Sequence, residues 1–466
     1  MDTTCPEATW IDESIIQETL NGTEGSDPSL IREILDKALE LKGLNMTDVA
    51  SLLTVRDPET LDEIRHTAKQ VKEEIYGSRL VLFAPLYISN LCNNECLYCA
   101  FRRSNTKLGR RVLTQAEIAD ETRILINQGH KRVLLVAGES YPEEGFKYVL
   151  DSIATVYSVK EGSGEIRRVN ANVAPLPLEG FKLLKGTGIG TYQCFQETYH
   201  RETYAKVHLA GLKRKYDWRV TAFDRAMQAG IDDVGVGVLF GLYDWRFEIL
   251  ALMQEIGHLE KEFGVGCHTI SVPRMEPALG SNMAENPPYP VDDEDFKKLV
   301  AILRMAVPYT GIIMSTRESA ELRTETLDLG VSQISAGSRT NPGGYAEDEH
   351  FGAAQFQLGD HRSLAEVVKD VAEMGYIPSF CTGCYRLGRT GQDFMDMAKP
   401  GLIKEKCGPN ALSTFREYLL DYATPEAAAA GEKAIAKELA RMTPKTRAVS
   451  EGLMARVSQG KRDVFC

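Results

Sequence analysis

The sequence predicts an α/β protein, a parallel (β/α)8 barrel of the TIM type with helical extensions at both ends. From Leu80 onward, short apolar runs alternate with amphipathic segments, and each pair is about as long as a strand–helix unit. The chain has 466 residues, 43% of them hydrophobic, which suffices for one barrel-sized core with additions. A closed barrel accommodates these units, and an open doubly wound sheet is the alternative.

The sequence of residues 1–78 predicts helices with polar N-terminal caps that precede the barrel. The segment at 27–43, DPSLIREILDKALELKG, has a cap, apolar residues at i, i+3 and i+4 spacing and a closing glycine. A second helix begins at NMTDVASLL. We expect this extension to form a lid or platform.

The barrel is expected over residues 79–345, because the alternation of strands and helices runs through this range. The intervening helices include Gln115–Gln128, Arg219–Ala229, Trp245–Phe263 and Asp293–Ala306. The eight expected strands are Leu80–Ile88, Arg132–Ala137, Arg167–Ala174, Gly190–Phe195, Asp233–Phe240, His268–Val272, Gly311–Ser315 and Val331–Ala336.

Residues 346–466 are expected to form a C-terminal domain. The chain becomes rich in Gly and Pro at SRTNPGGY, and a helix is expected near Ser363–Met374. The rest is mainly helical, including the alanine-rich stretch Ala427–Ala430.

Composition excludes several classes of protein. The formal charge of −12 disfavours nucleic acid or an anionic membrane surface as the main partner, because both reward a basic face. The first residues are acidic and lack the apolar run of a signal peptide, so we expect a cytoplasmic protein. In a reducing compartment, the 10 cysteines favour metal ligation over disulfides, and six of them fall in two groups.

The first group, Cys92, Cys96 and Cys99, lies in a loop that follows the first expected strand. Zinc usually requires a fourth protein ligand, and the next candidate, His130, is far along the chain. An iron–sulfur cubane held by three cysteines leaves one iron open, which makes it the preferred interpretation over structural zinc or unliganded thiols. Tyr98 places an aromatic ring where it can lie against a flat ligand.

This CxxxCxYC loop resembles the signature of the radical S-adenosylmethionine (SAM) superfamily. The resemblance implies a 4Fe-4S cluster whose free iron binds SAM, and an adenosyl radical that abstracts hydrogen from a substrate. The AGES segment is similar to the motif that holds the methionine amine, with Glu139 as acceptor, although a plain turn is the alternative. By the same resemblance Glu197 is the ribose-binding acid, with Gln193 a weaker candidate. Arg219 matches the residue that pairs with the methionine carboxylate in biotin synthase, and a surface arginine is its alternative.

The second group is Cys381, Cys384 and Cys407, in a CxxCx22C pattern. Zinc completed by a histidine and a second iron–sulfur cluster are the two interpretations. This pattern, together with CHTISVPR, STRESAELR and SAGSRTNPGGY, closely resembles the tyrosine lyases that mature di-iron hydrogenases. The resemblance covers nearly the whole chain.

The resemblance implies that L-tyrosine is cleaved at its Cα–Cβ bond to p-cresol and dehydroglycine. Carbon monoxide and cyanide then form on iron at an auxiliary 4Fe-4S cluster with an additional iron. A free cysteine bridges that iron, and His268 matches the histidine that ligates it. The alternative is that His268 is a histidine of the hydrophobic core with a purely structural role. An electron donor and the other hydrogenase maturases are the implied partners.

Geometry within the expected barrel separates two sites. His268 lies at the start of the sixth expected strand and Arg274 just past its end, so they face opposite mouths. SAM is expected at the mouth with the first cysteine group, the second group is expected at the other, and the barrel interior connects them. The candidates for the substrate carboxylate are four arginines: Arg274, Arg317, Arg323 and Arg339.

Two rival functions remain at this stage. The tyrosine lyase of thiazole biosynthesis shares the first motif and releases dehydroglycine, but it lacks the second cysteine group. A non-catalytic iron–sulfur scaffold belongs to another class, and the predicted SAM pocket weighs against it. Of the remaining cysteines, Cys194 and Cys267 are expected in the core and Cys5 and Cys466 at the surface, with Cys267 also a candidate ligand because it adjoins His268.

Overall fold

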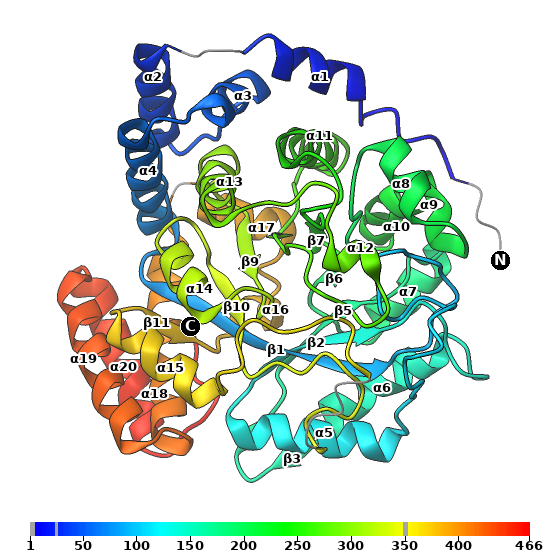
Figure 1. The fold of residues 1–466 in the computed structure, drawn as a ribbon. Coiled ribbons are helices and arrows are strands. Elements are labelled where there is room, and N and C mark those ends of the chain that lie inside the picture. Colours follow the sequence, from blue (N-terminus) through cyan, green and yellow to red (C-terminus); the bar gives the residue numbers. More distant parts are fainter. Residues whose placement is uncertain (1–4, 24–26, 348–352, 400) are drawn as a thin grey trace.

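The computed structural model describes residues 5–23, 27–347, 353–399 and 401–466. The first four residues of the expected N-terminal extension and residues 348–352 of the expected C-terminal domain therefore lie outside the described residues. A closed parallel barrel occupies the centre of the molecule, with helical extensions beside it (Figure 1).

Eight strands form the barrel, and all eight coincide with expected strands. Each pairs in parallel with its neighbours, and pairing of the last strand with the first closes the ring, which excludes an open sheet. The predicted (β/α)8 fold is thus confirmed. The strands are β1 (Arg79–Ser89), β2 (Arg132–Ala137), β5 (Arg168–Asn172), β6 (Tyr192–Gln193), β7 (Val234–Gly237), β8 (Thr269–Ser271), β9 (Gly311–Met314) and β10 (Gln333–Ser335).

Cap residues mark the ends of several barrel helices. Thr114 forms a capping box with Glu117 at the start of α5, and Gly129 ends that helix with φ 100°. The expected helix Arg219–Ala229 is instead broken at Thr221. The helices are α5 (Gln115–Gln128), α6 (Lys147–Ser158), α7 (Leu178–Gly186), α8 (Arg201–Val207), the 3₁₀ turn η1 (Leu212–Arg214), α9 (Tyr216–Val220), α10 (Ala222–Gln228), α11 (Trp245–Phe263), α12 (Asn282–Glu285), α13 (Asp293–Ala306) and α14 (Ala320–Leu327).

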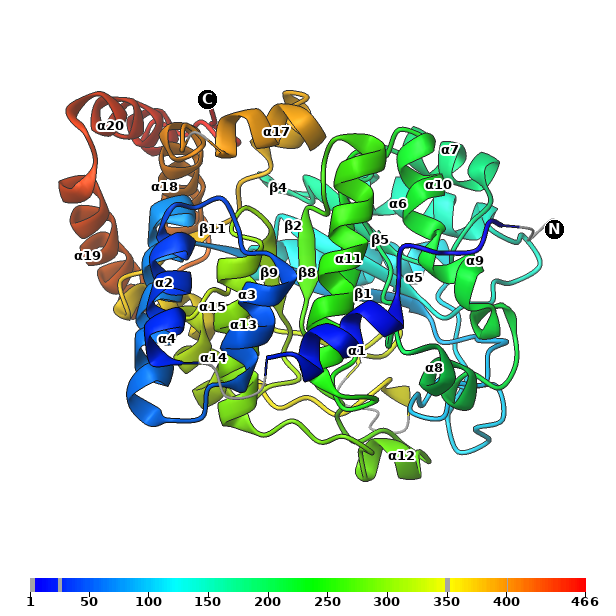
Figure 2. The same cartoon turned by 90° about the horizontal axis from the view of Figure 1, so that it is seen from above.

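The N-terminal helices cover one flank of the barrel. Helix α4 packs on α13 and α2, while α1 and α3 pack on α11 (Figures 1 and 2). Asp12, Asp27, Asn45 and Asp57 cap these helices, as the predicted polar starts require. The helices are α1 (Glu13–Asn21), α2 (Pro28–Leu39), α3 (Met46–Thr54) and α4 (Pro58–Tyr76).

The C-terminal extension adds a strand and six helices to the described structure. The strand β11 (Ile377–Ser379) pairs with the start of β1 outside the ring, and the sequence did not predict it. A short hairpin, β3 (Lys160–Glu161) and β4 (Gly164–Glu165), was also unpredicted. The helices are α15 (Leu364–Glu373), α16 (Gly383–Arg386), α17 (Gly391–Ala398), α18 (Lys404–Asp421), α19 (Pro425–Arg441) and α20 (Pro444–Ser458).

The two mouths of the barrel are covered differently. In Figure 2, α17 and α18 lie at one end of the molecule and α12 lies at the other. Among the described helices, none is long and apolar enough to cross a membrane.

Candidate active site and second cysteine site

The first cysteine loop is fixed at the mouth where the strands end. Glu95 and Leu97 donate backbone hydrogen bonds to the segment after α8, and the Cys99 N–H donates to the carbonyl of Cys96 at 3.1 Å. As a result Cys92, Cys96 and Cys99 all line one cavity of about 1410 Å³, counting the space that opens to solvent. The cavity is mainly apolar, with a polar wall on one side.

The thiols have the chemistry of cluster ligands. Burial raises the pKa of Cys92 to about 11 and also raises the pKa values of Cys96 and Cys99, so binding iron must release protons. Among the described residues, no three Cys, His, Asp or Glu side chains converge closely enough to hold a single ion. A cubane spreads its ligands over separate iron atoms, so the arrangement fits a cluster better than zinc.

The polar wall is built from paired charges, and Glu139 is at its centre. Arg219 donates to Glu139 Oε1 at 2.8 Å and to the carbonyl of Phe195 at 2.6 Å, while Asn94 donates to Glu139 Oε2 at 2.7 Å. Burial alone would raise the pKa of Glu139, but the charges of Arg219 and Lys213 hold it below its usual value. An ionised carboxylate beside a guanidinium matches the amino and carboxylate groups of the methionine end of SAM.

Gly138 explains why the AGES segment can lie against the cysteine loop. Its N–H donates to the carbonyl of Ser89, and a Cβ at this position would lie 2.1 Å from the carbonyl oxygen of Leu91. Only glycine permits this approach. The preceding Ala137, where the superfamily motif has glycine, is accommodated in the cavity lining.

Glu197 lies in the same wall and pairs with Lys213 at 2.6 Å. Its φ of 73° is unusual for a residue with a side chain, and such strain concentrates at functional sites. Gln193 also lines the cavity. Tyr98 is buried, and its hydroxyl is 2.8 Å from Nε2 of His208, so its ring forms part of the cavity wall.

The four candidate arginines fall into different environments. Arg317 lines the cavity, where its guanidinium stacks on Phe356 at 3.3 Å and makes one long contact, at 3.5 Å, to the carbonyl of Arg274. Arg339 is absent from the residues that line the cavity, although it donates to the carbonyl of Ser338, which does line it. The other two are held in ion pairs: Arg274 with Glu318 and Asp293, and Arg323 with Asp360.

The second cysteine group lines a separate cavity of about 600 Å³ with His268. Cys381 and Cys384 flank the start of α16, and Cys407 lies in the first turn of α18. A hydrogen bond from Cys384 lowers the pKa of Cys407. Three thiols and an imidazole in one cavity fit a cluster with an additional metal.

His268 is oriented by two side chains. Its Nε2 is 2.9 Å from the hydroxyl of Tyr385, and its Nδ1 is 3.6 Å from Asp233 Oδ1. Burial lowers the pKa of His268, which favours the neutral ring that metals bind. Cys267, in contrast, is buried, its carbonyl oxygen accepts a hydrogen bond from the Thr310 hydroxyl at 3.3 Å, and it is absent from the residues lining this cavity.

Sequence reasoning missed the partners of the site residues. Lys213, Asp233 and Glu276 belong to no local motif, and only the fold brings Lys213 and Glu276 to the first cavity and Asp233 beside His268. Asn94 lies within the first cysteine loop, but its contact with Glu139 was not predicted. Tyr385 was detectable, because it adjoins Cys384 in the chain. Of the other cysteines, Cys194 is buried in the core as expected, whereas Cys5 and Cys466 are half-buried.

This barrel, with three thiols and a wall of paired charges at its C-terminal mouth, is typical of a radical SAM enzyme. The Radical SAM superfamily model matches residues 86–256, and the Biotin and Thiamin Synthesis associated domain matches residues 271–377. Membership implies a 4Fe-4S cluster and SAM as cofactors.

Individual relatives narrow the assignment. The 2-iminoacetate synthase of Salmonella typhimurium is 30% identical over 378 residues, which are 81% of this chain and 96% of that one. A crystal structure of HydG, a maturase of the [FeFe]-hydrogenase, matches with TM-score 0.95 and 48% identity over 98% of this chain and 100% of that one. HydG from Carboxydothermus hydrogenoformans matches with TM-score 0.84 and 41% identity over 97% and 100%. The chain belongs to this family of radical SAM lyases that act on tyrosine.

Proposed function

We propose that the chain cleaves L-tyrosine at the Cα–Cβ bond to p-cresol and dehydroglycine, and converts dehydroglycine into carbon monoxide and cyanide at a second cluster for hydrogenase maturation. The observation that carries this proposal is the pair of cavities. One holds Cys92, Cys96 and Cys99 with the polar wall, and the other holds the second cysteine group with His268.

The first cavity suits an aromatic amino acid. Arg317 supplies a cation that forms no ion pair with a carboxylate among the described residues, and Glu276, in the same lining, supplies a carboxyl group. Burial raises the pKa of Glu276 to about 7, and the ammonium group of a bound substrate would favour its ionised form. Together they offer groups for the carboxylate and the ammonium of tyrosine, and the aromatic and aliphatic lining offers a place for its ring.

The proposed role of the residues in the first cavity is to bind and orient the cluster, SAM and tyrosine. When bound, the cluster supplies the electron that cleaves SAM, and the resulting adenosyl radical abstracts hydrogen from tyrosine. Cys92, Cys96 and Cys99 would hold the cluster, while Glu139 and Arg219 would fix the methionine end of SAM. Glu197 is the proposed ribose acceptor, and the apolar lining excludes water.

The second cavity is the proposed destination of dehydroglycine. Cys381, Cys384 and Cys407 would hold the auxiliary cluster, and His268 would bind the additional iron together with a free cysteine. When bound, that iron supplies the site at which the two diatomics are made. An electron donor and the other hydrogenase maturases complete the proposed set of partners.

The identity to HydG, 48% over 98% of the chain, supports this assignment over the thiazole-type lyase. The 2-iminoacetate synthases match 81% of the chain or less, and their name describes release of the fragment that we call dehydroglycine. A cluster scaffold is disfavoured, because it requires no pocket for SAM or for an amino acid.

The decisive experiment is the double substitution Cys381→Ser with Cys384→Ser in anaerobically reconstituted protein. We expect p-cresol to persist, carbon monoxide to disappear, and dehydroglycine to be recovered as glyoxylate. Cys5→Ser with Cys194→Ser serves as a control for loss of two thiols. Carbon monoxide at the parental ratio to p-cresol would refute the role of the second cavity.

His268→Ala tests the additional iron separately. This variant should lose that iron and the carbon monoxide output while SAM cleavage continues. Loss of both clusters and a lower melting temperature would indicate instead a histidine that only stabilises the core.

A further inference from the structure

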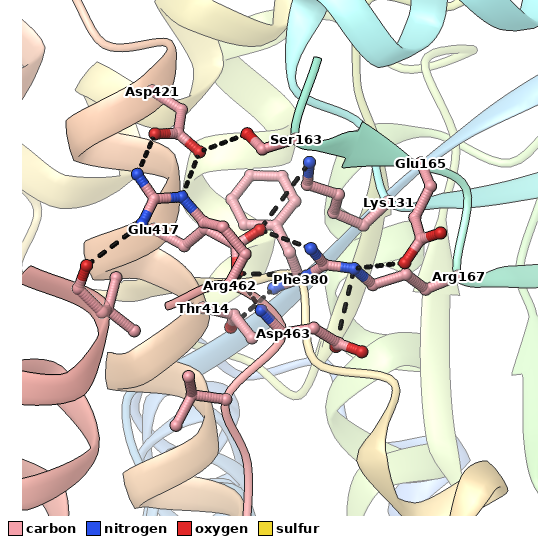
Figure 3. Close-up of polar contacts among 12 residues, drawn as sticks. Lys131, Ser163, Glu165, Arg167, Phe380, Thr414, Glu417, Asp421, Arg462 and Asp463 are labelled. Atoms are coloured by element: carbon pink, nitrogen blue, oxygen red, sulfur yellow. Dashed lines mark hydrogen bonds and ion pairs between the residues drawn. The ribbon is translucent and has the colours of Figure 1, made fainter. Parts of the chain in front are cut away.

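The last residues of the described chain lie across the second cysteine site. We define the tail segment as residues 461–466 and the CxxC loop as residues 380–389. The tail segment follows α20 and enters the space between the CxxC loop, α18 and the start of β5, where Asp463 lies beside Arg167 and Glu417 (Figure 3).

Asp463 connects three separate parts of the molecule. Its carboxylate pairs with Arg386 of the CxxC loop, with one Nη2–Oδ1 contact at 2.5 Å, and lies 3.5 Å from Nε of Arg167. Its N–H donates to Oε2 of Glu417 in α18 at 2.8 Å. Its φ of 58° is a left-handed conformation that costs energy for a residue with a side chain, so the surrounding contacts must hold it there.

Glu417 and Arg167 give this connection a rigid base. Arg167 donates to both oxygens of Glu417, at 2.6 and 3.2 Å, and both side chains are 2% exposed. Lys131, also buried, lies 3.8 Å from Glu417 Oε1. Asp463 therefore binds to a charge cluster that is itself fixed between β5 and α18 (Figure 3).

Two further contacts reach the CxxC loop directly. Arg389, which lines the second cavity, donates through Nη2 to the carbonyl oxygen of Cys466 at 2.6 Å. Phe465 packs on Gly383, the residue before Cys384, so closely that a Cβ there would lie 3.0 Å from Cδ2 of the ring. The guanidinium of Arg386 covers the same ring at 4.6 Å.

The tail segment also binds α18, the helix that carries Cys407. Asn410 exchanges two hydrogen bonds with Cys466, at 2.8 and 3.2 Å, and the Ser413 hydroxyl donates to the carbonyl of Val464 at 2.6 Å. One short segment thus contacts both of the elements from which the second cysteine group comes.

We propose that the tail segment is a clasp that holds the CxxC loop against α18, with Asp463 and Phe465 as positioning residues for the three thiols of the auxiliary cluster. The inference rests on the proposed function of the second cavity. The reason for such a device is geometric: a cluster needs its three ligands at fixed separations, and the CxxC loop has only a one-turn helix of its own.

Hydrogen exchange of the metal-free full-length chain tests the clasp without any cluster. We expect Asp463→Asn and Phe465→Ala to raise amide exchange in peptides covering 380–389 by about tenfold or more, with the barrel strands unchanged. The matched controls are Glu451→Gln, which removes an exposed acid of α20, and Leu420→Ala, which removes an exposed apolar side chain of α18.

Reconstitution provides the second readout. Both variants should lose iron and the electron paramagnetic resonance signal of the auxiliary cluster, while the SAM-responsive signal and p-cresol formation persist. Exchange in 380–389 equal to that of the controls overturns the clasp, and so does an increase throughout the barrel. If the clasp variants loosen the loop but Cys381→Ser with Cys384→Ser loses no iron, the clasp stands and the proposed function fails.

Discussion

Replacing Arg317 tests how the cavity recognises its substrate. The guanidinium stacks on Phe356 within the cavity and forms no ion pair with a carboxylate among the described residues, so its N–H donors are free to bind a substrate carboxylate. Arg317→Ala removes a guanidinium group that can donate two charge-assisted hydrogen bonds to a carboxylate. At about 1.5 kcal/mol for each bond, the loss is about 3 kcal/mol, or about a 100-fold rise in KM for tyrosine.

Arg317→Lys retains the positive charge but loses the bidentate hydrogen bonding of the guanidinium, and we expect about a tenfold rise in KM for tyrosine. Arg339→Ala is the matched control, because Arg339 was an equal candidate in the sequence but is absent from the residues that line the cavity. Its KM should remain within about twofold of the parental value.

The assay is p-cresol formation against tyrosine concentration, with SAM and a reductant under anaerobic conditions. L-Tyrosinamide, which lacks the carboxylate charge, is the second substrate: the parental protein should discriminate strongly against it, and Arg317→Ala should discriminate little. Melting temperature and iron content establish that each variant is folded and loaded. An unchanged KM in Arg317→Ala with a raised KM in Arg339→Ala would refute the assignment.

Three further changes have distinct expected outcomes. Glu255 accepts a hydrogen bond from Trp10 Nε1 at 2.8 Å, and burial raises its pKa to about 8. The stability that its neutral form gives the folded protein is therefore lost as the pH rises from about 4.5 to 8. At pH 9 the free energy of unfolding of Glu255→Gln should exceed that of the parental protein by on the order of 4 kcal/mol, with a higher melting temperature, and at pH 4.5 the two should differ little; equal melting temperatures at both pH values contradict this. Gly138→Ala should weaken SAM binding at least about tenfold, measured by SAM cleavage against SAM concentration, because the new Cβ meets the carbonyl of Leu91; parental affinity contradicts the close approach. Gly235→Ala should narrow the barrel interior and lower the ratio of carbon monoxide to p-cresol. An unchanged ratio argues against passage of dehydroglycine through the barrel interior.

The elements that could be predicted from sequence are those with local signals. Helices α5, α11 and α13 have the bounds expected, because a cap residue begins each and a long apolar period follows. The strand β11 was missed because it is three residues long and contains Pro378, and its pairing with β1 is a tertiary contact. The break at Thr221 had no local signal that we recognised.

The cysteine groups could be found from spacing, but the ranking of the arginines could not. Arg317 and Arg323 are six residues apart in one motif, and the sequence gives both a similar polar context. What separates them is Asp360, which reaches Arg323 from a distant segment and leaves Arg317 to the cavity. Pairing between distant segments is decided by the fold.

The interior of the barrel bears on why the two cysteine sites lie at opposite mouths. Register pairs Gln193 with Gly235, Gly235 with Thr269, and Thr269 with Gly311, so these four residues follow one another across four neighbouring strands. In such barrels the interior positions are usually filled by bulky branched side chains. Here two of the four residues are glycines and the other two are polar, while Gln193 lines the first cavity and Gly311 lines the second.

On the proposed function, a small polar fragment that passes between the two cavities meets the hydrogen-bonding side chains of Gln193 and Thr269. Thr269 Oγ1 is buried without a protein partner among the described residues, which leaves a donor and acceptor for a passing ligand. On the proposed function, these small and polar positions would admit dehydroglycine more readily than the aromatic ring of p-cresol. Tyrosine cleavage at one mouth and the proposed iron chemistry at the other would then share only that fragment.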